Sequence, residues 1–421
     1  MKHKLYLSIL VCILNLVTTS NAADRPGGKM FATRSEVMAE HGMVATSQPL
    51  AAQIGLDILK QGGSAVDAAI AANAAMGLMR PNSNGMGGDL FAIVWDPKTE
   101  KLYGLNASGR SPKSLTREAF AKEGITEAIP SLGKFFISVP GCVDGWFELH
   151  GKFGKLPIAT ILQPTIDYAN NGHPVPEVIA SGWQSLVDSR GKRPDLYPGF
   201  VETFSKHGVA PKKGDLWTNQ ALGNTLSMIA KGGRDAYYKG PIARTIDAYM
   251  KEIGGYLSYE DLAAHHSEWV EPVSTNYRGW DVWELPPNGQ GIAALQILNI
   301  LEGFDLKSAG FGSAEHIHAF LEAKKLAYED RAKFYADQDF AKVPVAKLIS
   351  KSYADERRKR INPNRAAQTY APGILEQGDT IYLCTADSSG MMVSLIQSNF
   401  SGFGSGVCIP ELGFGFQNRG S

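Results

Sequence analysis

The sequence predicts a layered α/β (α+β) protein, in which helices pack against sheets. Two observations lead to this prediction: apolar residues recur at helical spacing over 48–79, and they alternate as in strands over 90–105 and 380–398. The 45 glycines and 22 prolines indicate the many tight turns that join packed layers. A chain of 421 residues is long enough for two or three domains, or for one large layered domain.

The composition excludes some classes of function. The chain is 44% hydrophobic and 20% charged, and its 42 Lys and Arg residues balance its 42 Asp and Glu residues. This neutral balance argues against a surface that neutralises nucleic-acid phosphates, and it gives no reason to expect binding to an anionic membrane. We therefore expect neither nucleic acid nor a membrane as a partner.

The segment 1–22 has the pattern of an export signal. Residues 2–4 are basic, 5–17 form an apolar run, and small residues at 20–22 provide a cleavage site. The apolar run is too short for a comfortable membrane span. We expect export to the periplasm or the outside, with cleavage near Ala22; an uncleaved anchor is the alternative.

Three cysteines follow the predicted signal: Cys142, Cys384 and Cys408. They have no CxxC spacing, and no histidine pair has HExxH spacing. We therefore expect small buried side chains rather than a disulfide framework, and we expect no metal ion and no cofactor.

Two capped helices are expected before the first strands. Ser47 should cap a helix over 48–60, and Ser64 should cap a second over 65–79. Strands over 90–95 and 101–105 come next. Later helices are expected over 157–170, 216–231, 291–301 and 314–335. The last should carry an apolar face formed by Phe320, Ala323, Leu326, Ala327 and Phe334.

The glycine-rich link 82–89 has two interpretations. Gly85, Gly87 and Gly88 could cradle an anion with their backbone amides. However, the link runs from a helix to a strand, the reverse of the order that a nucleotide-binding loop requires. Both this order and the neutral charge argue against a phosphate-binding enzyme.

A hairpin near the C-terminus is the feature around which the chain is organised. Two strand-like runs, 380–386 and 391–398, are joined by turn residues. Alternate positions such as Ile381 and Val393 can face a core, which leaves Thr380 at the mouth of the first strand. The local pattern leaves two roles open for this threonine, an ordinary strand start or a hydroxyl used in chemistry.

Six short runs add a family resemblance. They are Gly85-Met-Gly-Gly-Asp89, Val139-Pro-Gly141, 271–279, 286–292, 322–331 and Gly378-Asp-Thr380. Together, in this order, they resemble the γ-glutamyltransferase (glutathione hydrolase) family, whose members are N-terminal-nucleophile hydrolases. The details of the hairpin are similar to a divergent branch that includes cephalosporin-acylase-like members. The resemblance covers essentially everything from about Thr33 onward.

The resemblance implies an αββα sandwich made as a precursor that cuts itself between Asp379 and Thr380. Large-subunit region 23–379 and small-subunit region 380–421 would then form a heterodimer. Thr380 would be the nucleophile, and its new α-amine, which titrates near pH 8, would be the general base. The implied substrates are γ-glutamyl or related acyl amides, with water or an amine as acceptor.

The resemblance also implies roles for five further residues. Ser398 matches a hydroxyl that bonds the nucleophile, and Asn418 belongs to a substrate-binding segment. Phe400 and Arg419 stand where typical members have Asn and Gln, and Arg110 lies two positions from an arginine that binds the substrate's α-carboxylate. These substitutions make hydrolysis of an amide a safer expectation than γ-glutamyl transfer.

The family's small subunit is several times longer than the segment from Thr380 to Ser421. The missing part would complete the second sheet and supply the Gly-Gly donors of the oxyanion hole. We therefore expect a truncated product, a gene fragment or half of a split protein, inactive and uncleaved by itself. A catalytically inactive exported scaffold or binding protein derived from this family is the alternative.

Overall fold

The computed structural model describes residues 36–130, 132–368 and 381–420. Every helix and strand described below lies in the unit His41–Ser421. The predicted signal 1–22 lies outside the described residues, as do Asp379 and Thr380. The predicted boundaries between signal, large-subunit region and small-subunit region therefore stay predictions.

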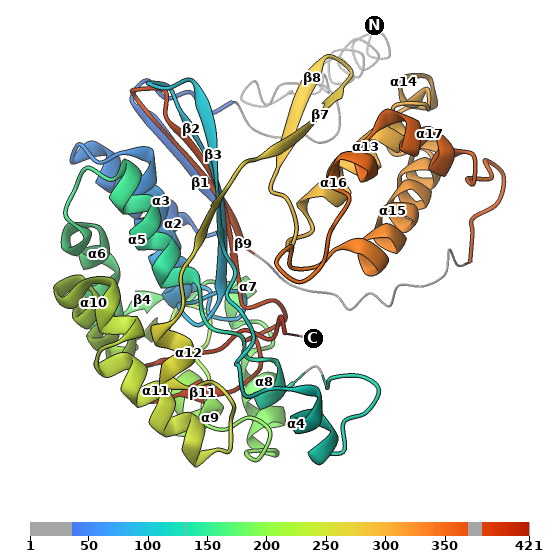
Figure 1. Ribbon diagram of the computed structural model, residues 1–421. Coiled ribbons are helices and arrows are strands. Elements are labelled where there is room, and N and C mark those ends of the chain that lie inside the picture. Colours follow the sequence, from blue (N-terminus) through green and yellow to red (C-terminus); the bar gives the residue numbers. More distant parts are fainter. Residues whose placement is uncertain (1–35, 131, 369–380, 421) are drawn as a thin grey trace, which may run out of the picture. The chain divides into compact units, whose positions relative to one another are not determined.

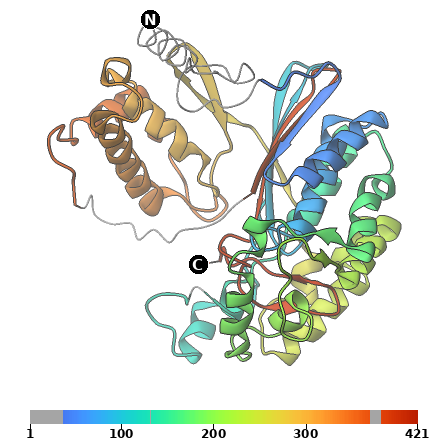
Figure 2. The same cartoon turned by 180° about the vertical axis from the view of Figure 1, so that it is seen from behind.

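An antiparallel sheet of six strands organises the described residues, in the order β1-β9-β10-β2-β3-β6 (Figure 1). The strands are β1 (Gly42–Thr46), β9 (Ile381–Asp387), β10 (Met392–Ser398), β2 (Asp89–Asp96), β3 (Lys101–Ala107) and β6 (Glu268–Val270). The predicted hairpin is confirmed as β9 and β10, which lie between β1 and β2. Figure 2 shows β9 beside β1, so strands from opposite ends of the chain are neighbours.

Helices cover one face of this sheet. Helices α2 (Pro49–Lys60), α3 (Ala65–Met79) and α5 (Cys142–Phe153) contact its strands, and α6 (Ile158–Asn171) and α10 (Gln220–Tyr238) pack behind them. Fourteen of the fifteen residues of α3 are buried, because its many alanines allow close approach on all sides. Inward-facing side chains of β9 and β10, such as Leu383 and Leu395, complete this core.

The two predicted helix caps have different outcomes. Ser64 is confirmed: its hydroxyl accepts from the amide of Asp67, whose carboxylate accepts from the amide of Ser64. The prediction for Ser47 is wrong. The side chain of Gln48 caps α2 instead, by accepting from Leu50 N at 2.7 Å, while Ser47 Oγ accepts from the guanidinium of Arg80.

Shorter elements complete the fold. The helices are α4 (Arg117–Lys122), η1 (Lys134–Phe136), α7 (Glu177–Ala180), α8 (Trp183–Gly191), α9 (Phe200–Phe204), α11 (Pro241–Glu252), α12 (Tyr259–Ala263), α14 (Leu306–Ala309), α16 (Val345–Leu348) and α17 (Lys351–Arg358). The strand pairs are β4 (His173–Pro174) with β5 (Leu216–Trp217), β7 (Val273–Tyr277) with β8 (Trp280–Glu284), and β11 (Cys408–Ile409) with β12 (Phe414–Gly415). The helix expected from 216 begins only at Gln220, because Leu216 and Trp217 form β5 and Asn219 caps the helix.

Helices α13 (Gly291–Leu301) and α15 (Ala314–Phe334) pack together with α17 in a core of their own. The expected burial of Phe320 is wrong, because its side chain is 44% exposed. The predicted burial of Ala323, Leu326 and Ala327 is confirmed, and the buried stripe of α15 also includes Ala319.

The other face of the six-stranded sheet is open to solvent among the described residues. It is apolar: Tyr382, Met392 and Ile396 are 53%, 56% and 39% exposed. Ile396 pairs with both Tyr382 and Phe91, so these three side chains form a row across adjacent strands. The described residues therefore build one six-stranded sheet that helices cover on one face, together with three two-stranded pairs.

Candidate active site

The carboxyl end of β10 gathers most of the predicted site residues that the structure describes. Ile381, the first residue of β9, pairs with Gln397 of β10, and Ser398 follows as the last residue of that strand. Ser398 is buried: its amide donates to Asp89 Oδ1 at 3.1 Å, and its hydroxyl oxygen accepts from Phe400 N at 2.7 Å. Thr380, the predicted nucleophile, immediately precedes Ile381 in the sequence.

Asp89 joins Ser398 to Arg419. Its carboxylate is 1% exposed, and its second oxygen accepts from Arg419 Nε in an ion pair. Burial raises the pKa of Asp89, while the positive charge of Arg419 and the hydrogen bonds to the carboxylate act in the opposite direction. The carboxyl group of Asp89 thus holds two segments of chain together.

Phe400 and Asn418 lie at the same place. Phe400 has a φ of +78°, a left-handed conformation that is unusual for a bulky residue, and Arg419 Cζ lies 4.9 Å from the centre of its ring. Asn418 is buried. Its side-chain oxygen accepts from Ser401 N, and its backbone N–H donates to Asn399 O. The C-terminal segment therefore lies alongside the turn that follows β10.

The glycine-rich link packs closely against β10 and the C-terminal segment. The carbonyl of Gly87 accepts from Gln417 N at 3.0 Å, and that of Gly88 accepts from Gly141 N. A Cβ atom on Gly87 would lie 2.2 Å from Gly415 O, and one on Gly88 would lie 2.4 Å from Ser398 O. These glycines permit close backbone approach, which is the role of the link in this structure.

Arg110 points to a different set of partners. Its guanidinium forms ion pairs with Glu268 at 3.0 Å and with Asp337 and Asp339 at 2.7 Å each. Its side chain is 42% exposed, and Phe340 lies beneath it. The structure therefore brings Ser398, Phe400, Asn418 and Arg419 together, whereas Arg110 connects the end of β3 to the segment after α15.

Three polar residues of this region could not be assigned a role from the sequence. Asp89 ends a glycine-rich run, and Gln417 and Asn399 belong to no motif that predicts their contacts. Gln417 donates to Ser108 O, and its side-chain oxygen is buried without a partner among the described residues. The signal that could have revealed Asp89 is its type: an acid directly after glycines, at the start of a buried strand, needs a cation or hydrogen-bond donors as partners.

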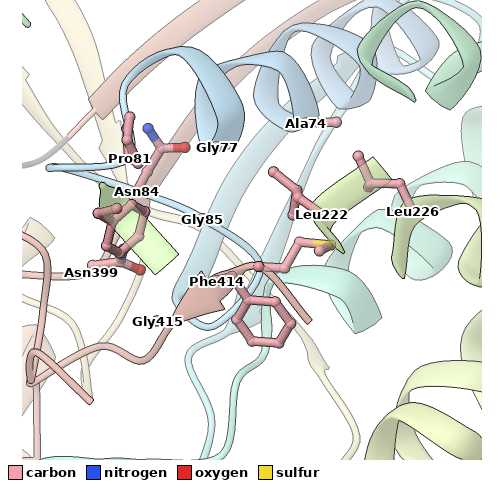
Figure 3. A pocket seen from close by; sticks show the side chains of 13 residues that line it. Ala74, Gly77, Pro81, Asn84, Gly85, Leu222, Leu226, Asn399, Phe414 and Gly415 are labelled. Carbon is pink, nitrogen blue, oxygen red and sulfur yellow. The ribbon is translucent and has the colours of Figure 1, made fainter. Parts of the chain in front are cut away.

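A cavity of about 20 Å³ lies beside Asn399, large enough for one water molecule. Asn84 and Asn399 line one side and face the apolar Leu222 and Leu226, as Figure 3 shows. The side-chain oxygens of both asparagines are buried without a partner among the described residues. The cavity is therefore polar on the side nearest β10.

Other kinds of site have little support in the described ranges 36–130, 132–368 and 381–420. No three His, Cys, Asp or Glu side chains there are arranged to hold a metal ion. Within the same ranges, no helix combines the length and the apolar character needed to cross a membrane. Cys142 and Cys408 are buried free thiols, as expected, and Cys384 is half-buried.

Comparison with known proteins gives a consistent result. Residues 51–421 match the family described as Gamma-glutamyltranspeptidase. The chain is 36% identical over 380 residues to the Glutathione hydrolase-like YwrD proenzyme of Bacillus subtilis, covering 90% of this chain and 70% of the relative. It is 35% identical over 394 residues to the Glutathione hydrolase proenzyme of Escherichia coli, covering 91% and 67%.

Solved structures agree with the fold. The cephalosporin acylase from Bacillus halodurans superposes with a TM-score of 0.86 at 45% identity, covering 94% of this chain and 72% of that one. The γ-glutamyltranspeptidase of Helicobacter pylori superposes with a TM-score of 0.74 at 31% identity, covering 80% and 97%. The predicted N-terminal-nucleophile hydrolase fold is thereby confirmed.

Proposed function

Because the chain belongs to the γ-glutamyltranspeptidase family of enzymes, we propose that it is a self-processing amidohydrolase whose nucleophile is Thr380. The observation that carries this proposal is the register of the hairpin. Ile381, the first residue of β9, pairs with Gln397, and Ser398 follows Gln397 in β10. Thr380 precedes Ile381 in the sequence, and we infer from this register that the hydroxyl nucleophile has the buried hydroxyl of Ser398 as its partner.

The proposed processing step needs no outside reagent but water. Thr380 Oγ attacks the carbonyl carbon of Asp379, the peptide nitrogen of Thr380 leaves and takes up a proton, and an ester forms. Water then hydrolyses the ester, which restores the hydroxyl and leaves a free α-amine on Thr380. This amine titrates near pH 8, so it can accept the hydroxyl proton during catalysis at neutral pH.

The catalytic cycle repeats the same chemistry on a substrate. Thr380 Oγ attacks a substrate amide, the amine leaves, and an acyl-Thr380 ester remains until water or an acceptor amine resolves it. Ser398 Oγ already accepts from the amide of Phe400. We therefore assign its hydroxyl proton to a hydrogen bond toward the nucleophile.

The substrates are proposed to be γ-glutamyl or related acyl amides. Relatives carry the names glutathione hydrolase, acylase and oxamate amidohydrolase. Phe400 and Arg419 replace residues of typical γ-glutamyl-binding members, which favours hydrolysis over transfer and a donor other than γ-glutamyl. The segment 1–22 is proposed to direct export.

The two subunits are proposed to stay together after cleavage. Strand β9 pairs with β1 through five residue pairs, and β10 pairs with β2 through seven, so the small-subunit region is held on both sides by strands of the large one. The relatives named as proenzymes support such a precursor.

An inactive exported scaffold remains the second candidate, and Phe400 and Arg419 are the observations that favour it. Both candidates are tested by expressing the gene from genomic DNA that runs past the codon for Ser421. The proposal predicts two fragments, the second beginning with Thr380, and a single uncleaved chain for Thr380→Ala. A single chain for the wild-type protein supports the scaffold, and two fragments in Thr380→Ala would falsify self-processing.

A further inference from the structure

We propose that His265 controls the release of the edge strand β6: when its buried imidazole gains a proton, the segment 264–270 leaves the sheet, and the rest of the fold stays in place. This inference goes beyond the proposed function and does not depend on the nucleophile. It concerns the end of the sheet at which β6 pairs with β3.

The imidazole of His265 is buried against residues of α5 and α10. Its ring stacks on Tyr238 of α10, and burial raises the pKa of Tyr238, so the phenol stays neutral. Its Nε2 lies 3.6 Å from Asp144 Oδ2, too far for a hydrogen bond, and is buried without a partner among the described residues. A proton on Nε2 would therefore have neither water nor an acceptor in this position.

The carboxylate of Asp144 is already engaged with other donors. Arg234 Nε donates to Oδ1, and both the amide and the hydroxyl of Ser267 donate to Oδ2 at 2.5 Å. Asp144 is 1% exposed, and Arg234 balances its charge within the fold. Protonation of His265 would thus leave one positive charge in excess in a buried site.

The charges around His265 oppose its protonation. Burial lowers the pKa of His265 to about 4; the carboxylate of Asp144 acts in the opposite direction, and Arg234, His266 and Arg110 add to the decrease. A histidine that is released to solvent has a pKa near 6.5. Release of His265 is therefore coupled to proton uptake between about pH 6.5 and pH 4, and acidification across this window favours the released state.

Strand β6 is the part of the sheet that this excess charge can displace most readily. It has three residues, all of them only partly buried, and it lies at the edge of the sheet, whereas β9 and β10 have a strand on each side. Directly before it, Arg234 donates to His265 O and Ser267 donates to Asp144. Turning His265 out to solvent breaks these bonds and removes the support of the strand.

The side-chain contacts that β6 would lose lie largely at the surface. Glu268 pairs with Arg110 at 3.0 Å, but the two side chains are 43% and 42% exposed, and such pairs contribute little to stability. Trp269 donates to Glu148 and contacts Phe153 edge-on. Trp269 is thus the main side chain that resists release, and its departure would leave the edge of β3 unpaired.

Hydrogen exchange of the full chain, followed by mass spectrometry between pH 7 and pH 4, tests this inference. Rates are corrected for the pH dependence of an unstructured peptide. In the wild type, the protection of amides 268–270 should fall by about threefold to tenfold per pH unit between pH 6 and pH 4.5. The amides of β9 and β10 should stay at least about tenfold better protected, because their exchange requires global unfolding.

His265→Phe keeps an aromatic ring against Tyr238 but takes up no proton, so the protection of 268–270 should change less than about twofold per pH unit. His266→Asn, at the exposed neighbouring histidine, is the matched control and should behave as the wild type. His265→Gln, which also takes up no proton, replaces His265→Phe if that variant does not fold.

Three results would overturn the inference. The pH dependence of 268–270 could persist in the His265 variant, which would assign it to another group. Amides 268–270 could exchange at the same rate as those of β9 at every pH, which would show global unfolding alone. Protection of 268–270 that rises on acidification would show that protonated His265 pairs with Asp144 and holds the segment in place.

Discussion

At the scale of single residues, Asp89 makes the contacts that fix the candidate site, because it bonds both Ser398 and Arg419. Ionised carboxylates are rarely buried without a cation, and the partner here comes from 330 positions further along the chain. The same carboxylate accepts from the amide of Ser398, so one side chain fixes the end of β10 and the C-terminal segment. Packing alone would not set the position of Arg419, which is partly exposed.

Removing one charge of this pair should cost more than removing both. Arg419→Gln leaves Asp89 buried and unpaired, and we expect the free energy of unfolding to fall by about 3 kcal/mol at pH 7. Asp89→Asn/Arg419→Gln should recover part of this loss, because no buried charge remains. Urea denaturation followed by circular dichroism measures both variants. A double variant that is less stable than Arg419→Gln contradicts this interpretation.

The pH dependence of Arg419→Gln follows from the direction of the pKa shift. Burial raises the pKa of Asp89, and the variant loses the cation that opposes this shift. A carboxyl group with a raised pKa in the folded state stabilises the fold at low pH, and this contribution is lost as the pH rises through the folded pKa. The deficit of Arg419→Gln relative to wild type should therefore shrink on acidification.

At the scale of elements, the link 85–88 is shaped by close approach to β10 and the C-terminal segment. Gly88→Ala would place a Cβ 2.3 Å from Gln397 Nε2 and 2.4 Å from Ser398 O, and the backbone oxygen cannot move away freely. We expect a loss of about 2–3 kcal/mol in stability. Gly151→Ala is the matched control: it lies in α5 with nothing within 4 Å of the added atom. That change should stabilise the protein by about 0.5–1 kcal/mol. Equal melting temperatures for the two variants would disprove the packing argument.

Local signals predicted the elements that depend on local interactions. The hairpin of β9 and β10 follows from alternation and turn residues, and the Ser64 cap depends on Asp67, three residues away. Ser47 failed as a cap because its hydroxyl bonds Arg80, 33 positions along the chain. The spacing of apolar residues predicted Ala323, Leu326 and Ala327 on the buried face of α15. It did not predict that Phe320, at the edge of this face, is 44% exposed, because the extent of the face depends on how α15 packs against α13 and α17.

The same distinction applies to the candidate site. Ser398, Phe400, Asn418 and Arg419 were named from short motifs, and the structure brings them together at the end of β10. The partners of Arg110 could not be predicted, because Asp337 lies 227 positions away in a loop without a motif. Asp89 was missed as a connecting residue for the same reason. Asp379 and Thr380 stay predictions, since they lie outside the described residues.

At the scale of the whole molecule, stability should depend on the pH through His265. Its side chain is 4% exposed, stacks on Tyr238 with ring centres 5.2 Å apart, and lies 3.6 Å from Asp144. Burial lowers the pKa of His265 to about 4, and the nearby carboxylate of Asp144 opposes this shift while Arg234, His266 and Arg110 add to it. The folded protein therefore keeps this imidazole neutral where an unfolded chain, with a pKa near 6.5, binds a proton.

Acidification from about pH 6.5 to pH 4 should therefore destabilise the fold, because the unfolded state binds more protons in this window. His265 contributes up to about 1.4 kcal/mol per pH unit there. His265→Phe keeps an aromatic ring against Tyr238 but cannot titrate, so its stability should fall less steeply across the window. Urea denaturation of both proteins at several pH values measures the slopes, and identical slopes would exclude His265 as the cause.

The sheet also determines how the proposed subunits are joined. Because β9 and β10 lie between β1 and β2, the residues that follow the proposed cleavage site are central strands of the same sheet. A cut before Thr380 would free one strand end without separating the strands. The nucleophile would then gain its α-amine while the hydrogen bonds that position Ser398 stay in place.

The most direct test of self-processing at Thr380 is the identity of the first residue of the small fragment. The gene, expressed from genomic DNA that extends past the codon for Ser421, is purified as wild type and as Thr380→Ala, and each protein is analysed by intact mass and N-terminal sequencing. Self-processing by Thr380 predicts a wild-type fragment that begins with Thr380 and a single uncleaved chain for the variant. A fragment that begins at another residue, or cleavage that persists in Thr380→Ala, would contradict it.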